Sequence, residues 1–301
     1  MRQECISLEP KLFLASNFAF GWRISLWALL LACAVRLVCS HIAVGELAGI
    51  VLLGLAFAHG VELQHQALHH SGFKWRPAND IIGTILGLPM LVSYSEYRIT
   101  HLWHHRKLGT TEDREFFDYR KKRKGINEML NRIFLIPHFR GVIKNGLCAL
   151  TGRRFSGFDD KEQHGLRISN ILCLGTIILL MLASILFHSY KPILCWLVAL
   201  IFVASPLHFL IEHPEHFNCK SDSMVPYENT RTIRSNRFLT WFTNGNNFHV
   251  EHHCFPSIPM HRVEIVHQVV RPYLKNYNTG YLKYFQYVLG ATRKSSGRRK
   301  N

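Results

Sequence analysis

The chain has 301 residues, which suits one or two domains; 48% of the residues are hydrophobic and 19% are charged. This composition excludes a disordered or collagen-like chain. Lysine and arginine number 36 against 20 acidic residues, for a formal net charge of +16, and there are 19 histidines. Because imidazole is the commonest protein metal ligand, three classes stay open: a nucleic-acid binder, a membrane protein with basic loops and a metal enzyme.

Four apolar stretches predict membrane-spanning helices at residues 24–43, 44–63, 165–187 and 192–211. Each is close to the roughly 20 residues that a bilayer-crossing helix needs. The alternative, four buried core helices of a soluble protein, is disfavoured because so many such stretches are hard to bury in one chain. A shorter apolar stretch, residues 81–92, has the length of a re-entrant or interfacial segment. The first stretch lacks a small-residue cleavage site, so we expect no cleavable signal peptide.

The basic residues are concentrated in two segments. Residues 93–161 and 217–301 hold 28 of the 36 lysines and arginines, whereas the links after the first and third stretches hold only Lys191. The positive-inside rule then places both segments and both termini on the cytoplasmic side. The run 120–124 (RKKRK) lacks interleaved aromatics, so it is interpreted as a solvated or lipid-facing stretch rather than a nucleic-acid site.

These observations predict an all-α, multi-pass membrane protein. We expect four transmembrane helices under a cytoplasmic helical cap, with an N-terminal cytoplasmic segment at 1–23, a membrane domain at 24–275 and a basic tail at 276–301. The bacterial inner membrane is favoured over the endoplasmic reticulum. The eight cysteines form no C-x-x-C pair, which indicates packing residues in a reducing compartment.

Nine histidines fall in three short groups, H-Q-A-L-H-H (65–70), H-L-W-H-H (101–105) and H-V-E-H-H (249–253). Each group has histidines at i and i+4, which share a helix face with Cβ atoms about 5–6 Å apart. His104 and His252, at i+3, lie on the same faces, whereas His70, at i+5, turns away from His65. Three such pairs exceed the needs of one tetrahedral zinc and suit two ions. Imidazole favours Zn, Cu, Fe or Ni, and the spacing does not choose among them.

A fourth region, His208 to His216, adds candidates. His213 lies just past the predicted span, within reach of the cytoplasmic groups, so we expect it to be a ligand. His208 could be a further ligand or a hydrogen-bonded histidine near a span end. His216 is interpreted as a solvated loop residue.

A metal-bound histidine usually donates its other ring nitrogen to a carboxylate or carbonyl. Several acidic residues lie close enough in sequence to accept it, although each could equally be an ordinary charge: Glu62, Glu96, Glu112, Asp113, Glu212 and Glu251. Asn246 and Asn247 could orient a ligand or a metal-bound water, or could be turn residues after Gly245.

The three histidine groups in order, on a plan of four spans, resemble the integral-membrane fatty acid desaturase and hydroxylase superfamily. The flanks are also similar: residues 96–113 look like the second-box region of bacterial members, and 230–232 with 247–259 look like the third. The run H-F-L-I-E-H (208–213) is similar to a segment of sphingolipid desaturases and supports His213. The resemblance covers roughly residues 45–275.

The resemblance implies a non-haem diiron centre, O2 as co-substrate and an electron donor. The metal ligands that it implies are His65, His69, His101, His104, His105, His249, His252 and His253, with His213 as the ninth. His70 stands where the family often has glycine, so it remains, with His208, only a further candidate. Glu212, Asn247 and Glu251 are candidates for the layer behind the ligands, and no catalytic residue is expected beyond the ligands.

The leading hypothesis is therefore an O2-dependent desaturase of a free, carrier-bound or lipid-bound acyl chain. We expect a separate electron donor, a ferredoxin or a cytochrome with its reductase, because no haem-binding donor domain is present. The first alternative is a hydroxylase or ketolase of an alkyl, carotenoid or specialised-metabolite substrate on the same scaffold. The second is a non-enzymatic metal-binding membrane protein, which histidines at span ends rather than along a path disfavour. A nucleic-acid partner is not expected in a chain with four spans.

Overall fold

The structure is a computed structural model that describes residues 8–114 and 125–288. Cys5, the basic run 120–124 and residues 289–301 of the basic tail lie outside the described residues. Over the described residues the chain is mostly helical, which confirms the predicted class. The seven cysteines in this part of the chain form no disulfide.

The longer helices are α1 (Asn17–Val38), α2 (Ala43–Leu68), α3 (Arg76–Gly87), α4 (Tyr94–Lys107), α5 (Gly125–Ile133), α6 (Ile136–Leu150), α7 (Asp160–Leu186), α8 (Lys191–Val198) and α9 (Ser205–His216). Shorter helices follow: α10 (Pro226–Asn229), α11 (Arg237–Phe242), α12 (His249–Cys254) and α13 (Val263–Val270). The strands β1 (Thr232–Ile233) and β2 (Tyr277–Asn278) pair in parallel, with Thr232 opposite Tyr277.

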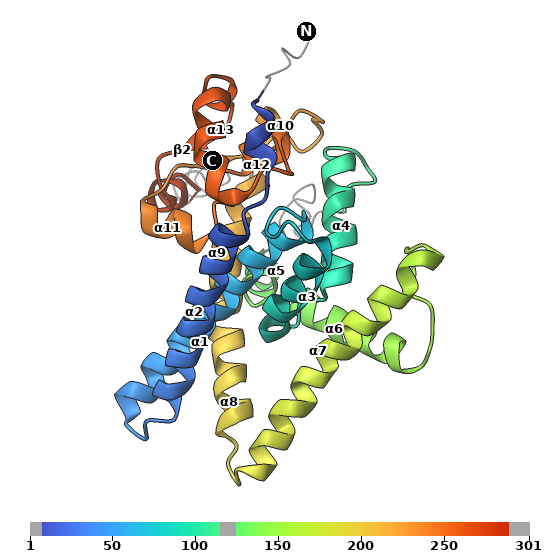
Figure 1. Cartoon of the computed structure of the whole chain (residues 1–301), viewed down its shortest axis with the longest axis vertical. Helices are drawn as coiled ribbons and strands as arrows, with labels where there is room; N and C mark the ends of the chain where they lie inside the picture. The colour runs from blue at the N-terminus through green and yellow to red at the C-terminus, as the bar shows by residue number, and fades with distance from the viewer. Residues whose placement is uncertain (1–7, 115–124, 289–301) are drawn as a thin grey trace, which may run out of the picture.

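Four helices are long and apolar enough to cross a membrane: Pro10–Val38, Ala43–Leu68, Asp160–Leu186 and Lys191–His216. They confirm the number of predicted spans, although the last one continues five residues past its predicted end. The most apolar windows of the second and fourth helices are 50% and 44% buried, against 17% for the first and third. The second and fourth therefore form the inner pair, and the others lie outside them (Figure 1).

The inner pair packs closely because a glycine lies at the contact. A Cβ on Gly54 would lie 2.3 Å from the Cβ of Val203 and 3.0 Å from the carbonyl oxygen of Ala199. Small residues at such positions let two helix backbones approach each other in a membrane. By contrast, a Cβ on Gly175 of α7 would meet nothing within 4 Å.

We therefore expect Gly54→Val to lower the stability of the detergent-solubilised protein, because the added methyl groups overpack this contact by about 1–3 kcal/mol. Gly175→Ala is the matched control and should leave the thermal midpoint unchanged or slightly raised. Thermal unfolding followed by circular dichroism measures both. Equal midpoints for wild type and Gly54→Val would contradict the close contact.

The fourth span is one continuous helix with a change of pitch. Residues Ala199–Ala204 are a π-helix between α8 and α9. Ser205 donates its hydroxyl to the carbonyl of Leu200 at 2.8 Å, and Pro206, which has no N–H, follows at the start of α9. A π turn changes the helical phase and is frequent near functional sites. Here it separates the apolar lower half of the helix from the histidine-bearing α9.

The apolar stretch predicted at residues 81–92 belongs to a short amphipathic helix. Helix α3 buries Asn79, Gly83 and Leu86, while Ile81 and Ile85 are exposed. It packs against α2, and the 3₁₀ turn Leu88–Met90 ends it. Its 12 residues are too few to cross a bilayer.

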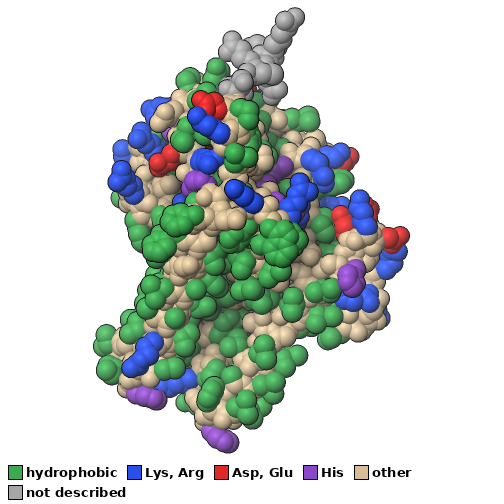
Figure 2. Space-filling view, viewed as in Figure 1, with side chains coloured by type: hydrophobic (Ala, Val, Ile, Leu, Met, Phe, Trp, Pro, Cys, Tyr) green, Lys and Arg blue, Asp and Glu red, His purple; other side chains and the backbone are tan. Residues whose placement is uncertain are grey.

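The second and fourth long helices end at Leu68 and His216, so His65 and His216 lie at the same end of the bundle. We call this end the histidine end. Helices α4 and α10–α13 gather there, above the apolar part of the bundle (Figure 1). Figure 2 shows most lysine and arginine side chains of this face at the same end and apolar side chains over the rest. On this face, the described basic side chains thus lie mostly toward the histidine end.

Candidate metal centre

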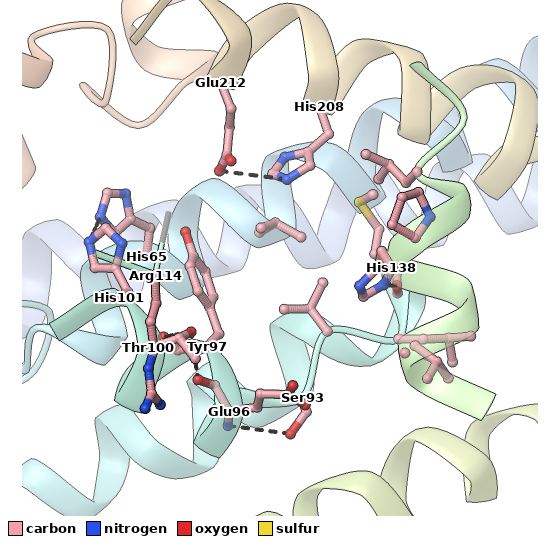
Figure 3. Close-up of a pocket in the computed structure, with 18 of the residues that line it drawn as sticks. His65, Ser93, Glu96, Tyr97, Thr100, His101, Arg114, His138, His208 and Glu212 are labelled. Carbon is pink, nitrogen blue, oxygen red and sulfur yellow. Dashed lines mark hydrogen bonds and ion pairs between the residues drawn. The ribbon is translucent and has the colours of Figure 1, made fainter. Parts of the chain in front are cut away.

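A cavity of about 630 Å³ lies between the inner helices, α4 and α6. His65, His101, His104 and His249 line one end of it. Figure 3 shows His138 at the opposite side from His65 and His101, with His208 and Glu212 along a third wall. Apolar residues line the part near His138: Met90, Leu91, Val92, Leu135 and Val142. The cavity therefore joins the histidines to an apolar pocket.

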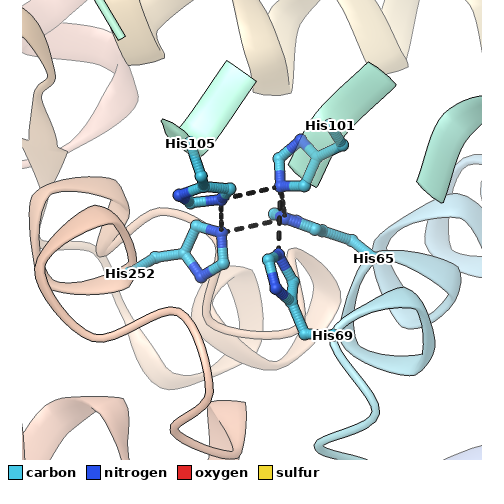
Figure 4. A group of neighbouring side chains, drawn as sticks. All are labelled: His65, His69, His101, His105 and His252. Atoms are coloured by element: carbon cyan, nitrogen blue, oxygen red, sulfur yellow. Dashed lines mark hydrogen bonds between the residues drawn. The ribbon is translucent and has the colours of Figure 1, made fainter. Parts of the chain in front are cut away.

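Five histidines point their Nε2 atoms toward one another at the end of this cavity (Figure 4). The Nε2 atom of His101 lies 2.8 Å from that of His65, 3.0 Å from that of His69 and 2.9 Å from that of His105. The Nε2 atom of His252 lies 3.0 Å from those of His65 and His105. We call these five residues the first histidine group.

Four more histidines form a second histidine group beside the first. The Nε2 atom of His249 lies 3.0 Å from those of His216 and His253, and the Nε2 atom of His104 lies 3.3 Å from that of His253. All four side chains are buried. The two groups touch, since the ring centroids of His105 and His253 are 4.2 Å apart.

The distances between ring nitrogens within each group suit one ion bound by the members of that group. Metal–imidazole bonds of about 2.1 Å place neighbouring ligand nitrogens roughly 3 Å apart at right angles. Burial, followed by neighbouring imidazoles, holds the pKa well below its usual value at several of these histidines: His69, His101, His105, His249, His252 and His253. These rings are therefore neutral near pH 7, the form that binds metal.

The lowered pKa values predict how the iron-free protein responds to acid. In the unfolded chain these histidines bind protons below about pH 6.5, whereas in the fold they stay neutral to much lower pH. The unfolded state then holds more protons, so the free energy of unfolding decreases as pH falls below about 6.5. We expect the thermal midpoint of the metal-free protein to drop between pH 7.5 and 5.5. A flat profile over this range would contradict the neutral, buried clusters.

Helix α4 supplies histidines to both groups because of its phase. Ser93 caps its N-terminus by accepting from the backbone N–H of Glu96 at 3.4 Å. One turn separates His101 from His105, which join the first group, while His104 belongs to the second. Three histidines on one helix face thus bridge the two clusters.

Helix α2 ends at the first group, and its last residues decide which histidines join it. His65 lies within the helix and His69 is its C-cap. His70 follows with a φ of 54°, in the left-handed region, which turns its side chain away. Its Nε2 lies 2.8 Å from a carboxylate oxygen of Asp80. The structure does not bring His70 into either group.

The loop before helix α12 is hydrogen-bonded to α2. Asn244 and Gly245 form the turn before it, with φ values of 51° and 85°. Asn244 donates to the carbonyl of Glu62 at 3.2 Å and to the side-chain oxygen of Gln66 at 3.1 Å. Asn246 donates to the carboxylate of Glu62 at 2.6 Å. These bonds hold the histidines of residues 249–253 close to those of residues 65–69.

In the second histidine group, the Nδ1 atoms of His104, His216 and His249 each lie near an oxygen atom of another residue. The Nδ1 atom of His104 donates to Asp113 at 2.7 Å, and the Nδ1 atom of His216 lies 3.1 Å from the carbonyl oxygen of Asn229. The Nδ1 atom of His249 lies 3.4 Å from a carboxylate oxygen of Glu215. Such partners fix the ring orientation of a metal ligand. Of these three, only Asp113 was among the acidic candidates named from the sequence.

Two of the candidates for this layer, Asn247 and Glu251, contact other segments of the chain instead. Asn247 donates to the carbonyl of Ile233 at 2.8 Å. Glu251 accepts from the hydroxyl of Thr232 at 2.5 Å and lies 2.5 Å from Nδ1 of His267. Asn247 thus joins the start of this region to β1, and Glu251 joins α12 to β1 and α13.

The fourth region is arranged differently from the sequence-based expectation. His213 lies outside both groups: its ring packs on Phe217, with centroids 4.3 Å apart, and its Nδ1 lies 3.2 Å from the hydroxyl of Tyr284. His216 joins the second group instead. The interpretation of His216 as a solvated loop residue was wrong, because α9 continues to it and it is 4% exposed.

His208 and Glu212 form a third cluster with Glu62. The Nδ1 atom of His208 lies 3.7 Å from Glu62, and its Nε2 lies 3.5 Å from Glu212. His208 and Glu212 line the wall of the cavity (Figure 3). It is separate from the nine clustered histidines.

The chain matches the sequence model of the family described as fatty acid desaturase over residues 40–285. It is 23% identical to an acyl-lipid (9-3)-desaturase from Physcomitrium patens, covering 91% of this chain and 57% of that one. It is 23% identical to a fatty acid desaturase from Bacillus subtilis (strain 168), covering 73% and 66%. It is 30% identical to a dihydrorhizobitoxine desaturase from Bradyrhizobium elkanii, covering 77% and 69%.

The chain spans less than two thirds of the length of the first two of these relatives. The family match nevertheless covers most of the chain and includes all nine clustered histidines. The chain therefore belongs to the fatty acid desaturase family.

Proposed function

We propose that the protein is a membrane-bound oxidoreductase that uses O2 and a diiron centre to desaturate an acyl or acyl-like chain. The observation that carries this proposal is the pair of buried histidine groups, five and four residues, at the end of one cavity. Family membership and the desaturase names of the relatives support it.

In this proposal the first ion is held by His65, His69, His101, His105 and His252, and the second by His104, His216, His249 and His253. The residues fit iron because they offer only neutral imidazole nitrogens at ligand spacing. Bound iron would supply the reduction of O2 and the removal of hydrogen from an unactivated C–H bond. We assign no metal to His70 or His213.

In this proposal the protein orients the histidine rings and encloses the substrate chain. Asp113, Asn229 and Glu215 fix the rings of the second group, so the ligand nitrogens are arranged before an ion arrives. The apolar part of the cavity, around Met90 and Leu135, would hold the chain and exclude water. The substrate could reach it from the bilayer, because the cavity lies between helices that are apolar enough to span one.

We also propose that the histidine end faces the cytoplasm, because most of the described lysine and arginine side chains on the face in Figure 2 lie there. A separate reductant, a ferredoxin or a cytochrome with its reductase, would dock at this basic end. Long-range attraction would steer an acidic donor toward it, and this attraction weakens with salt.

The test is to purify the protein, load it anaerobically with iron, and supply O2, a reductant and acyl substrates of graded length. We expect two irons per chain and a product lighter than the substrate by two hydrogen atoms. A product heavier by one oxygen atom would instead assign a hydroxylase on the same scaffold. Zinc binding alone, with no turnover, would contradict the diiron proposal and favour the non-enzymatic alternative.

A further inference from the structure

A buried acid–base cluster lies beside the cavity, separate from the two histidine groups. It consists of Glu62 on α2 with His208 and Glu212 on α9, and we call it the acid–base triad. Glu62 is 1% exposed and His208 is 4% exposed. Ionisable groups buried at such depth are costly to keep, and within a membrane domain they usually serve function.

The three side chains form a chain of alternating acid and base. His208 lies between the two carboxylates, with Nδ1 toward Oε1 of Glu62 and Nε2 toward Oε1 of Glu212. The other carboxylate oxygen of Glu62 is occupied, since it accepts from Asn246 at 2.6 Å. Oε1 of Glu62 accepts no hydrogen bond from the residues that the structure describes. It is thus the oxygen placed to exchange a proton with His208.

The triad leads toward the histidine groups along one helix face. His208, Glu212 and His216 follow one another at intervals of four residues on α9, so they share a face. Glu212 and His208 line the same cavity as His104 and His249 of the second group. A water molecule in this cavity could therefore connect Glu212 to the place where oxygen is reduced.

The proposed reaction needs such a path. In each turnover O2 becomes two water molecules, which takes four electrons and four protons. The substrate gives up two hydrogen atoms, the separate electron donor supplies two electrons, and the remaining two protons come from the medium. Hydroxylation also consumes two protons from the medium, so the need does not depend on which reaction occurs.

We propose that Glu62, His208 and Glu212 form a proton relay that feeds the cavity beside the histidine groups. Glu62 receives a proton that comes from the medium. His208 takes this proton at Nδ1 and gives one from Nε2 to Glu212, which passes it to water in the cavity, and the His208 ring then returns to its first tautomer before the next transfer. The distances of 3.5 and 3.7 Å would shorten when the relay operates, as contacts of acid–base groups often do on substrate binding. This inference rests on the proposed function, because it assumes that O2 is reduced at the histidine groups.

The experiment compares iron-loaded wild type with Glu62→Gln and His208→Asn, using reductant and substrate in H2O and in D2O. We expect both variants to keep two irons per chain and to turn over about 10²-fold more slowly, the scale of a lost acid–base group. Their solvent deuterium isotope effect should increase. Added imidazole should partly restore His208→Ala, which a merely structural role would not predict.

His59→Asn is the matched control. His59 is a buried histidine on α2, one turn before Glu62, and its Nδ1 donates to the carbonyl of Phe242 at 2.6 Å. It belongs to none of the three clusters, so this variant should keep the wild-type isotope effect.

Wild-type turnover and isotope effect in both relay variants would overturn the relay while leaving the proposed function intact. Loss of an iron in Glu62→Gln or His208→Asn, or a third bound ion in wild type, would instead assign the triad to metal binding. Absence of O2 consumption by iron-loaded wild type would overturn the proposed function together with the relay.

Discussion

We expect His216→Phe to reduce bound iron from two ions to about one and to abolish turnover, while His213→Phe keeps both ions. The two histidines are three residues apart on α9, and both are buried. Only His216 directs a ring nitrogen into a histidine group, at 3.0 Å from His249. Phenylalanine keeps the ring and removes the nitrogens, so the comparison isolates metal ligation.

The measurements are iron per chain by elemental analysis and product by mass spectrometry. His213→Phe is expected to lose the contact with the hydroxyl of Tyr284 but no member of either histidine group, and therefore to fold and bind iron. The reverse result, with iron lost in His213→Phe and kept in His216→Phe, would restore the ligand assignment that the sequence suggested.

The second large effect, on iron affinity, is expected from a substitution of Asp113, whose carboxylate accepts from Nδ1 of His104. Asp113 is buried against the histidine, and its other oxygen accepts from the backbone N–H of Gly109 at 3.2 Å. Burial alone would raise its pKa, but the hydrogen bonds from His104 and Gly109 hold the pKa below its usual value. A permanent carboxylate therefore fixes the His104 ring with Nε2 toward the ion.

We expect Asp113→Asn to weaken iron binding at the second group by about 10- to 100-fold, the usual cost of removing such a partner. Titration of the metal-free protein with ferrous ion under anaerobic conditions measures this affinity. Glu112→Gln is the control, because the neighbouring Glu112 is exposed and pairs with the partly exposed Lys107; exposed pairs of this kind contribute little. Equal affinities for both variants would contradict the orienting role.

The sequence predicted the features that depend on local spacing. Histidines at i and i+4 share a helix face whatever the tertiary fold, so the intervals 65–69, 101–105 and 249–253 indicated which histidines lie together, and the structure gathers them in two groups. The two ion sites stay a prediction. Apolar length likewise predicted four spans. The acceptor Asp113 was identified only as one of several neighbouring charges, because sequence proximity cannot show which carboxylate faces a ring.

The arrangement of the fourth region depends on the whole helix. The apolar stretch was predicted to end at residue 211, yet α9 continues to His216. The carbonyl of Pro214 accepts from Arg231 at 3.0 Å, and Arg231 also donates to the carbonyl of Phe217 at 2.8 Å. An arginine far along the chain thus satisfies the carbonyls at this helix end, and local sequence carries no sign of it.

The order of the clustered histidines along the chain has a consequence for biosynthesis. Four of the five members of the first group lie within the first 105 residues, whereas two of the four members of the second group, His249 and His253, lie on α12. Each group includes at least one histidine of α12, so neither group is complete before that helix has been made. A chain truncated before His249 would have its four long helices but would lack one member of the first group and two members of the second.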